Sequence, residues 1–445
     1  MALGSVALAF ITVAIDRSLD PDTFKMSGVL APNSVEGTRT ILSIVTGSMI
    51  SVAGVTFSLT MVAVTNAAAQ YGPRLIGNFM RDKANQFTLG VFTSTFIYGL
   101  LILRVAHVGD PTSSGMNPTE FIPNVSVFFA MMMTLLSVGV LIYFVHHIPE
   151  TLNVGNITAR IGRDLRDRLR VLVVPEDIRR PRLGNDEAVH DVDLALRVPA
   201  KEEGYVQTLN FAYLVKVATL HDLIIELQFQ PGDFVVCGDV LLDAWKLDGT
   251  KIETDEKNAL IDSIRNAYAM GQSRTVHQNL LYLADELVEV LARALSPGVN
   301  DPYTATNCIH WYQSALNVMV AEPDPIADRF DEQNIRRVMM RPLTFETMLH
   351  VFAGKSRPYV ASDKIAAAEM LSMLGKLRAR ATSESRKTAL ANEMSALVRA
   401  AYDALPNEVD RESIADLANK ITSGLKDDVS LEKSRREEGW LGGTA

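Results

Sequence analysis

The sequence predicts a polytopic α-helical membrane domain of about four spans, followed by an α+β cytoplasmic body that combines a small β-barrel-like module with a helical bundle. The first observation behind this fold class is the uneven distribution of charge: the first 150 residues carry seven Lys/Arg and eight Asp/Glu, whereas the other 295 carry thirty-six and forty-four. The second is the run 40–73, thirty-four residues without a charged side chain, which exceeds the roughly 20 apolar residues that a helix needs to cross a bilayer. The third is that strand-like and then helical patterns follow residue 204.

Residues 1–150 are expected to form the transmembrane domain, with spans at about 1–15, 41–67, 84–103 and 125–147. The first segment is short for a span, so we expect it to be the remaining part of one whose start lies upstream. The other three are each bounded by charged residues and are long enough to cross a bilayer.

Basic residues indicate the orientation of these spans. They are denser in the connection 74–83 and in residues 160–170 than in the other loops, and basic loops stay on the cytoplasmic side. The N- and C-termini and the soluble body are therefore expected in the cytoplasm. Two cysteines, Cys237 and Cys308, give no disulfide framework and suit a reducing compartment.

The second span carries a face of small residues, which we name the small-residue face. Its members are Ser43, Gly47, Ser51, Gly54 and Ser58, spaced by four, four, three and four residues. Two interpretations stay open: the face packs closely against other helices, or it lines a water-filled path through an oligomer. At the inner end of the span, the helix is expected to break at Tyr71, Gly72, Pro73 and Arg74.

Residues 151–203 are expected to form a juxtamembrane helix and a connector. Arg163, Arg166 and Arg170 fall on one face of this helix. They could form solvated ion pairs with nearby aspartates, or contact the anionic head groups of membrane lipids. We expect lipid contact, because the helix follows the fourth span so closely.

The soluble body is predicted to contain a β-rich module at 204–250 and a helical domain at 251–429, with a flexible tail at 430–445. Strand-like runs at 223–229, 234–236 and 240–242 alternate with Gly-Asp turns, a pattern similar to half of a biotinyl-lipoyl-type barrel. Because no modifiable lysine lies in its turn, we expect an assembly role for this module. Helices are expected around 276–294, 302–319, 330–352, 363–381, 385–404 and 411–426.

No catalytic constellation is found in the sequence, so we expect no enzyme activity and no cofactor. Phosphate-binding loops, dinucleotide-binding glycines, zinc-protease motifs and nucleophile elbows are all missing from it. A metal site is not expected at Cys308 and His310, because residues two apart on a helix point to different faces. The formal net charge of −9 argues against a nucleic-acid partner.

The most informative soluble stretch is 293–305. It predicts a capped helix–turn–helix, in which Asp301 caps a helix that begins at Pro302. The alternative is a polar cluster for a ligand or a subunit contact. The residues of this motif are Arg293, Ser296, Pro297, Gly298, Asn300 and Asp301.

The same stretch, Arg-Ala-Leu-Ser-Pro-Gly-Val-Asn-Asp-Pro-Tyr-Thr-Ala, resembles the signature of a bacterial family of predicted membrane proteins, domain-of-unknown-function family 2254. Further matches lie at residues 71–82, 204–207, 231–235 and 271–275, so the resemblance extends from about residue 35 to about 425. Asp285-Glu286 stands where the family pattern has Arg-Gln. The resemblance implies the architecture given above and a bacterial inner-membrane location, and it carries no catalytic residues.

Together these observations predict a homo-oligomeric inner-membrane protein that passes ions or small solutes along its second span, with the cytoplasmic body controlling assembly or opening. The alternative is a membrane-anchored scaffold or sensor whose cytoplasmic body binds a ligand or partner without transport.

Overall fold

The fold was analysed in a computed structural model that describes residues 1–18, 35–72, 83–106, 122–173 and 192–424. The chain divides into two compact units, Met1–Asn156 and Ile157–Ala445, which we name the membrane unit and the body.

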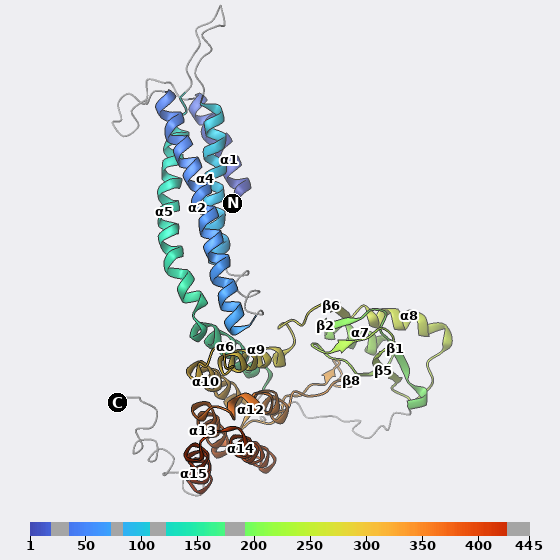
Figure 1. The fold of residues 1–445 in the computed structure, drawn as a ribbon. Coiled ribbons are helices and arrows are strands. Elements are labelled where there is room, and N and C mark those ends of the chain that lie inside the picture. The colour runs from blue at the N-terminus through green and yellow to red at the C-terminus, as the bar shows by residue number, and fades with distance from the viewer. Residues whose placement is uncertain (19–34, 73–82, 107–121, 174–191, 425–445) are drawn as a thin grey trace, which may run out of the picture. The chain divides into compact units, whose positions relative to one another are not determined.

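The membrane unit is a bundle of long helices (Figure 1). It contains α1 (Ala2–Ser18), α2 (Val35–Tyr71), α4 (Lys83–Val105) and α5 (Asn124–Leu152). Helix α4 packs against each of the other three. Two clusters of buried apolar side chains hold the bundle together, one centred on Tyr98 and Ile102 and the other on Phe92 and Ala53.

Three of these helices are long and apolar enough to cross a membrane, namely α2, α4 and residues Asn124–Glu150 of α5. At 37 residues α2 is longer than the predicted span 41–67 and measures about 55 Å, more than the roughly 30 Å of a bilayer core. Helix α1, with 17 residues, is shorter than the other three, so a fourth span stays a prediction.

The predicted break after the second span agrees with the end of α2. The helix ends at Tyr71, and Gly72 follows with φ +125°, a conformation that residues with a side chain rarely adopt. The amide of Gly72 still donates to the carbonyl of Ala68 at 3.0 Å. Pro73 and Arg74 lie outside the described residues.

The body begins with α6 (Val154–Leu172), whose first residues belong to the membrane unit. A mixed α/β region follows, with the short 3-10 helix η3 (Val192–Leu194), α7 (Phe211–Leu220) and α8 (Thr254–Arg265). Its strands are β1 (Leu196–Pro199), β2 (Gly204–Leu209), β3 (Leu223–Leu227), β4 (Phe234–Val235), β5 (Val240–Lys246), β6 (Tyr268–Gly271), β7 (Arg329–Phe330) and β8 (Arg336–Met339).

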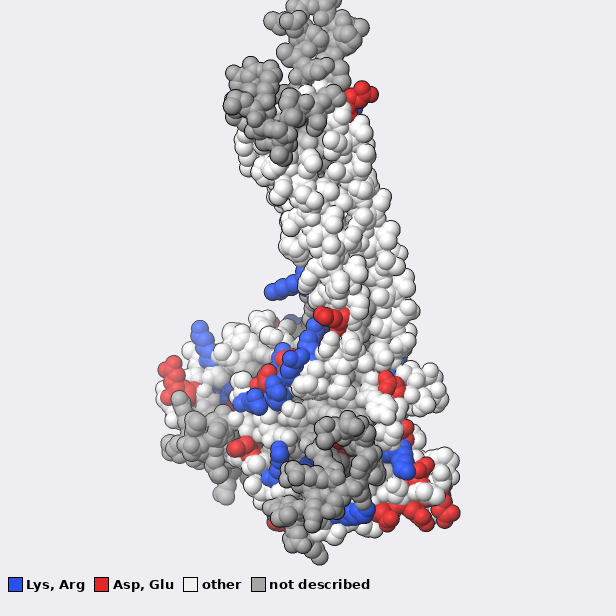
Figure 2. All heavy atoms as spheres, turned by 90° about the vertical axis from the view of Figure 1, so that its left-hand side faces the viewer, with Lys and Arg blue, Asp and Glu red and all other residues white. Residues whose placement is uncertain are grey.

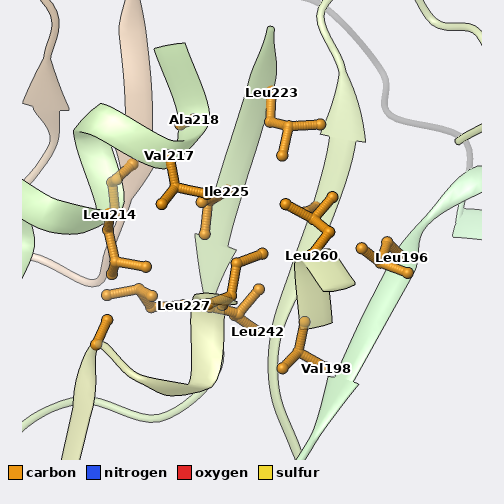
Figure 3. Packing of buried hydrophobic residues seen from close by; sticks show 14 of the residues in the cluster. Leu196, Val198, Leu214, Val217, Ala218, Leu223, Ile225, Leu227, Leu242 and Leu260 are labelled. Carbon is orange, nitrogen blue, oxygen red and sulfur yellow. The ribbon is translucent and has the colours of Figure 1, made fainter. Parts of the chain in front are cut away.

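These strands form two sheets, with orders β1-β5-β3-β8-β7 and β4-β2-β6. All neighbours are antiparallel except β3 and β8, where Ile225 pairs with Val338. Buried side chains of β1, β3 and β5 pack beneath α7 and α8, as Figure 3 shows for Leu227, Leu214 and their neighbours. The β-structure therefore uses strands on both sides of the predicted 204–250 module, and a barrel-like module is not confirmed.

The rest of the body is helical. It contains α9 (Leu280–Ala294), α10 (Pro302–Met319), α11 (Phe345–Leu349), the π-helical turn η4 (His350–Gly354), α12 (Lys355–Val360), α13 (Lys364–Arg380), α14 (Glu384–Ala404) and α15 (Glu408–Gly424). The π-helical turn lies just before Pro358, whose ring would otherwise meet the carbonyl four residues earlier.

The helix predicted at 330–352 is wrong over its first half. Strands β7 and β8 occupy 329–330 and 336–339, and only α11 and η4 are helical in that range. The reason is a buried ion pair: Nε of Arg337 lies 2.8 Å from Oδ2 of Asp331, and Nη1 lies 2.9 Å from Oδ1 of Asp222. The contact with Asp222 and a hydrogen bond from Nη1 to the carbonyl of Leu223 at 3.2 Å hold β8 beside β3, whereas the pair with Asp331 joins β8 to the turn after β7. These contacts override a weak local preference for helix.

Candidate functional site

The small-residue face of α2 points away from the rest of the membrane unit. All five of its members, Ser43, Gly47, Ser51, Gly54 and Ser58, are exposed. The buried side of α2 is formed by other residues, among them Leu42, Thr46, Met49, Ala53 and Thr60. The face is therefore not covered by α1, α4 or α5.

The glycines of α2 and α4 differ in whether they allow close packing within the protomer. A Cβ added to Gly99 of α4 would lie 2.5 Å from Oγ1 of Thr46, so this glycine allows α2 and α4 to approach each other. A Cβ added to Gly47 or Gly54 would meet nothing within 4 Å. Since a glycine inside a helix costs roughly 0.5–1 kcal/mol relative to alanine, packing within one protomer accounts for Gly99 but not for Gly47 and Gly54.

Bulky apolar side chains border the face. On a helix with 3.6 residues per turn, one border is formed by Ile50 and Phe57 and the other by Ile44, Val55 and Val62. All five are among the exposed large hydrophobic residues. Small residues spaced by four between apolar borders are typical of close contacts between membrane helices.

One hydroxyl group of the face is satisfied by its own helix. Oγ of Ser51 donates to the carbonyl of Gly47 at 2.9 Å. Just outside the face, Oγ of Ser48 donates to the carbonyl of Val45 at 2.9 Å. Such back-bonded hydroxyls tolerate both a dry and a hydrated environment, so hydrogen bonding leaves both interpretations of the face open.

A second polar feature of the membrane unit lies inside the bundle and is not predicted from the sequence. The carboxylate of Asp16 accepts hydrogen bonds from the amides of Val125 and Ser126 at 2.8 and 3.0 Å, and from the Ser126 hydroxyl at 2.6 Å. Asp16 of α1 thereby caps the N-terminus of α5, which is preceded by a proline without a capping side chain. The hydroxyl of Tyr98 donates to the Ser126 carbonyl at 3.0 Å and lies 2.9 Å from Oγ1 of Thr12.

Other buried polar atoms of the bundle have no hydrogen-bond partner among the described residues. They are the hydroxyls of Thr38, Thr46, Thr88 and Ser94 and both amide atoms of Asn85. A buried polar group without a partner is costly in hydrocarbon. The membrane unit therefore carries an outward polar set on α2 and an inward set on α2 and α4.

The predicted lipid-contacting arginines all lie on α6, but they differ in their surroundings. Arg163 and Arg170 are exposed, whereas Arg166 is half-buried. Asp167 lies 2.8 Å from Arg166 and 3.9 Å from Arg170. The guanidinium of Arg163 lies 5.8 Å from the centre of the Trp311 ring.

The 293–301 motif forms the corner between α9 and α10. Oγ of Ser296 donates to the carbonyl of Arg293 at 2.6 Å, and Asn300 has a left-handed backbone with φ +51°. Asp301 caps α10 through the amide and hydroxyl of Thr304, at 3.1 and 2.6 Å. Arg293 pairs with Glu289 at 3.5 Å. Pro297 and Gly298 complete the turn, so the side chains of Arg293, Ser296 and Asp301 have structural uses.

His310 and Cys308 of α10 both have their surroundings defined within the body. His310 Nε2 lies 2.9 Å from Oε1 of the buried Glu369. Burial raises the pKa of the Cys308 thiol well above its ordinary value, and the charge of Asp301 adds to this.

Among the described residues, no group of three or more His, Cys, Asp and Glu side chains is placed to hold a metal ion. A pocket of about 450 Å³ lies where β2 meets α7, away from every predicted site residue.

The profile of the family described as "Predicted membrane protein (DUF2254)" matches residues 1–376. The chain belongs to this family. Three similar proteins are uncharacterised, one from Mycobacterium bovis and two from strains of Mycobacterium tuberculosis. Each is 28% identical over 389 residues, which is 86% of this chain and 72% of the relative. No solved structure matches the chain.

Three of the segments that carry the resemblance, 204–207, 231–235 and 271–275, meet in the three-stranded sheet. A Cβ on Gly204 would lie 2.8 Å from the carbonyl oxygen of Gly271, so β2 and β6 approach at two glycines. Gln207 Nε2 donates to the carbonyl of Ser273 at 3.0 Å. Gly232, with φ +103°, lies against the side chain of Asn279 at the start of α9. The motifs thus join the sheet to the helical part of the body.

Asp285, where the resemblance leads us to expect arginine, has a structural use. Oδ2 of Asp285 lies 2.6 Å from Nη1 of Arg274, and Oδ1 lies 2.7 Å from Nζ of Lys355. One carboxylate therefore bridges the segment after β6 to α12. An arginine at this position would face two other cations, so this chain depends on an acid here.

Proposed function

We propose that this DUF2254 protein forms a homo-oligomer in the membrane and passes ions or small solutes along the small-residue faces of its α2 helices. The observation that carries the proposal is that the face is exposed in the protomer, while Gly47 and Gly54 serve no contact there. From Ser43 to Ser58 the face is about 22 Å long, most of the thickness of a bilayer core. Each protomer contributes only one small-residue face, so a path lined by these faces requires several copies of the protein.

In this proposal, α1 is a fourth span and the protein lies in the bacterial inner membrane. Both termini and the body lie in the cytoplasm. The density of basic residues in 74–83 and 160–170 supports it. In this proposal the body controls assembly or opening, and it performs no catalysis.

A second candidate function is favoured by the bulky apolar side chains that border the face, and the hydrogen bond from the Ser51 hydroxyl to the carbonyl of Gly47 is compatible with it. Because this hydroxyl needs no water, the faces could meet in dry helix–helix contacts. The protein would then be a membrane-anchored scaffold or sensor, with a body that binds a ligand or partner and no transport.

The test is ion flux through purified full-length protein reconstituted in liposomes, under voltage, osmotic and pH challenge. Ser51→Leu adds a bulky apolar group on the face, and Ser48→Leu makes the same change on an exposed serine of α2 outside the face. We expect the wild type and Ser48→Leu to conduct and Ser51→Leu to lose flux. Wild-type liposomes that stay closed under all three challenges would contradict the path. A change in assembly size alone, without flux in any variant, would favour the scaffold.

A further inference from the structure

Helix α6 presents one face to the body and leaves the other uncovered. Its buried residues are Thr158, Ile161, Gly162, Leu165 and Leu169, which recur every three to four positions. The apolar face of this amphipathic helix is therefore already occupied by protein. What remains available to a partner is the opposite, polar face.

The uncovered face is basic. Residues 157–172 contain five arginines and two aspartates, a net charge of +3. Arg168 and Asp164 pair with each other at 2.8 Å, and Arg168 also donates to the carbonyl of Val276 at 3.1 Å. When this pair is set aside, Asp167 is the one carboxylate in residues 157–172 that remains to balance the other four arginines. Figure 2 shows basic side chains gathered on the visible face of the body with acidic ones between them, whereas the visible face of the membrane unit is almost uncharged between its ends.

One of these arginines is held in place by an aromatic ring. A Cβ on Gly162 would lie 2.5 Å from Cβ of Trp311, so this glycine lets α6 approach α10 closely. The guanidinium of Arg163 lies over the same indole, 5.8 Å from its centre, and its Nε donates to the carbonyl of Ala159 at 3.1 Å. An arginine oriented by a cation–π contact loses less conformational freedom when it binds an anion.

The chain fixes how far this face can be from the membrane. Helix α6 begins two residues after α5 ends, and the membrane-crossing part of α5 extends to Glu150. Arg160 follows only ten residues later, a distance of about 15 Å along a helix. A basic helix this close to the end of a span is within reach of lipid head groups.

We propose that the uncovered face of α6 binds the head groups of anionic phospholipids through Arg160, Arg163 and Arg170. Since its apolar face is buried in the body, α6 contacts head groups without inserting into the acyl chains. This binding is independent of whether α2 lines a path, because it depends only on the body and on the end of α5.

The test uses the purified full-length protein in a zwitterionic detergent, titrated with short-chain phosphatidylglycerol or with phosphatidylcholine of the same chain length. Bound lipid is counted by native mass spectrometry. The triple variant Arg160→Gln, Arg163→Gln, Arg170→Gln is compared with a control that removes the same charge from exposed residues of α13, α14 and α15. The control substitutions are Arg380→Gln, Arg399→Gln and Lys420→Gln.

We expect the wild type and the control to prefer phosphatidylglycerol, and the α6 triple variant to lose this preference by about 100-fold, or about fivefold for each arginine. Added salt should weaken the preference. Replacing the same three arginines by lysine should retain it, which separates loss of charge from loss of folding. Equal loss in the control variant, no loss in the glutamine variant, or displacement of the lipid by an equal concentration of inorganic phosphate would each overturn the proposal.

Discussion

The contrast between Gly54 and Gly99 gives a quantitative test of which side of α2 packs within the protomer. Gly99→Ala places a methyl group 2.5 Å from Oγ1 of Thr46. Overpacking of this kind costs about 1–3 kcal/mol, and the better helix propensity of alanine returns roughly 1 kcal/mol. The net loss of unfolding free energy is therefore up to about 2 kcal/mol. Gly54→Ala meets nothing within 4 Å, so it should raise the unfolding free energy of the protomer by about 0.5–1 kcal/mol.

The assay is denaturant unfolding of both variants in detergent, at a dilution where size measurements show protomers. The two variants should differ in opposite directions from the wild type. Gly54→Leu should in addition reduce the assembly size in lipid nanodiscs, because the leucine would stand where a neighbouring copy or a path is proposed. If Gly54→Ala destabilised the protomer as much as Gly99→Ala, the small-residue face would be packed inside the protomer and would not be available to a neighbouring copy.

Three further predictions concern groups with defined partners. Asp16→Ala should lower the unfolding free energy by about 2 kcal/mol, because it removes the cap on α5, whereas Ser18→Ala on the exposed end of the same helix should have little effect. Asp331→Asn should cost about 3 kcal/mol near neutral pH, because it leaves the buried Arg337 with only the exposed Asp222 as a charged partner. Burial alone would raise the pKa of Asp331, but hydrogen bonds from arginine and backbone amides hold it below its ordinary value. The cost should therefore persist above about pH 4 and vanish as the wild-type carboxylate is protonated at lower pH; a cost that stayed constant down to pH 2 would contradict this. A maleimide should label the exposed Cys237 in the folded protein and the buried Cys308 only after unfolding, and rapid labelling of both would show that the body opens readily.

The membrane helices could be predicted from the sequence, but the direction in which each one faces could not. Charge-free runs located α2, α4 and α5, and spacing located the small-residue face. However, α2 carries bulky apolar residues on its exposed side, such as Ile44 and Phe57, as well as on its buried side, such as Leu42. Its buried side is selected by the close fit of Thr46 against Gly99, a contact between distant residues that hydrophobicity alone does not indicate.

In the body, the strands with local turn signals could be predicted from the sequence, but the pairing of distant strands could not. The turns around Gly232 and Gly238 predicted β3, β4 and β5 correctly, since their signals are local. The pairing of β8 with β3 joins residues more than a hundred positions apart, and β8 is only four residues long. Nothing in a four-residue run specifies its partner, so the pairing becomes evident only with the contacts of Arg337 to Asp222 and to the carbonyl of Leu223, at the start of β3.

Many polar side chains of the body hold its helices and strands together. Arg386 donates to the carbonyls of Met319, Val320 and Glu322 at the end of α10 and pairs with Asp324 at 2.8 Å. This buried arginine, like the caps and ion pairs described above, holds helices together. Groups committed in this way cannot change partners without a loss of stability. Surfaces that no other element of the protomer covers are then the better places to look for function, and the small-residue face of α2 and the basic face of α6 are two such surfaces. Because one lies in the membrane unit and the other in the body, changes on the small-residue face should leave lipid binding by α6 unaltered. A change on α6 that abolished flux while leaving lipid binding intact would support the proposed control of the path by the body.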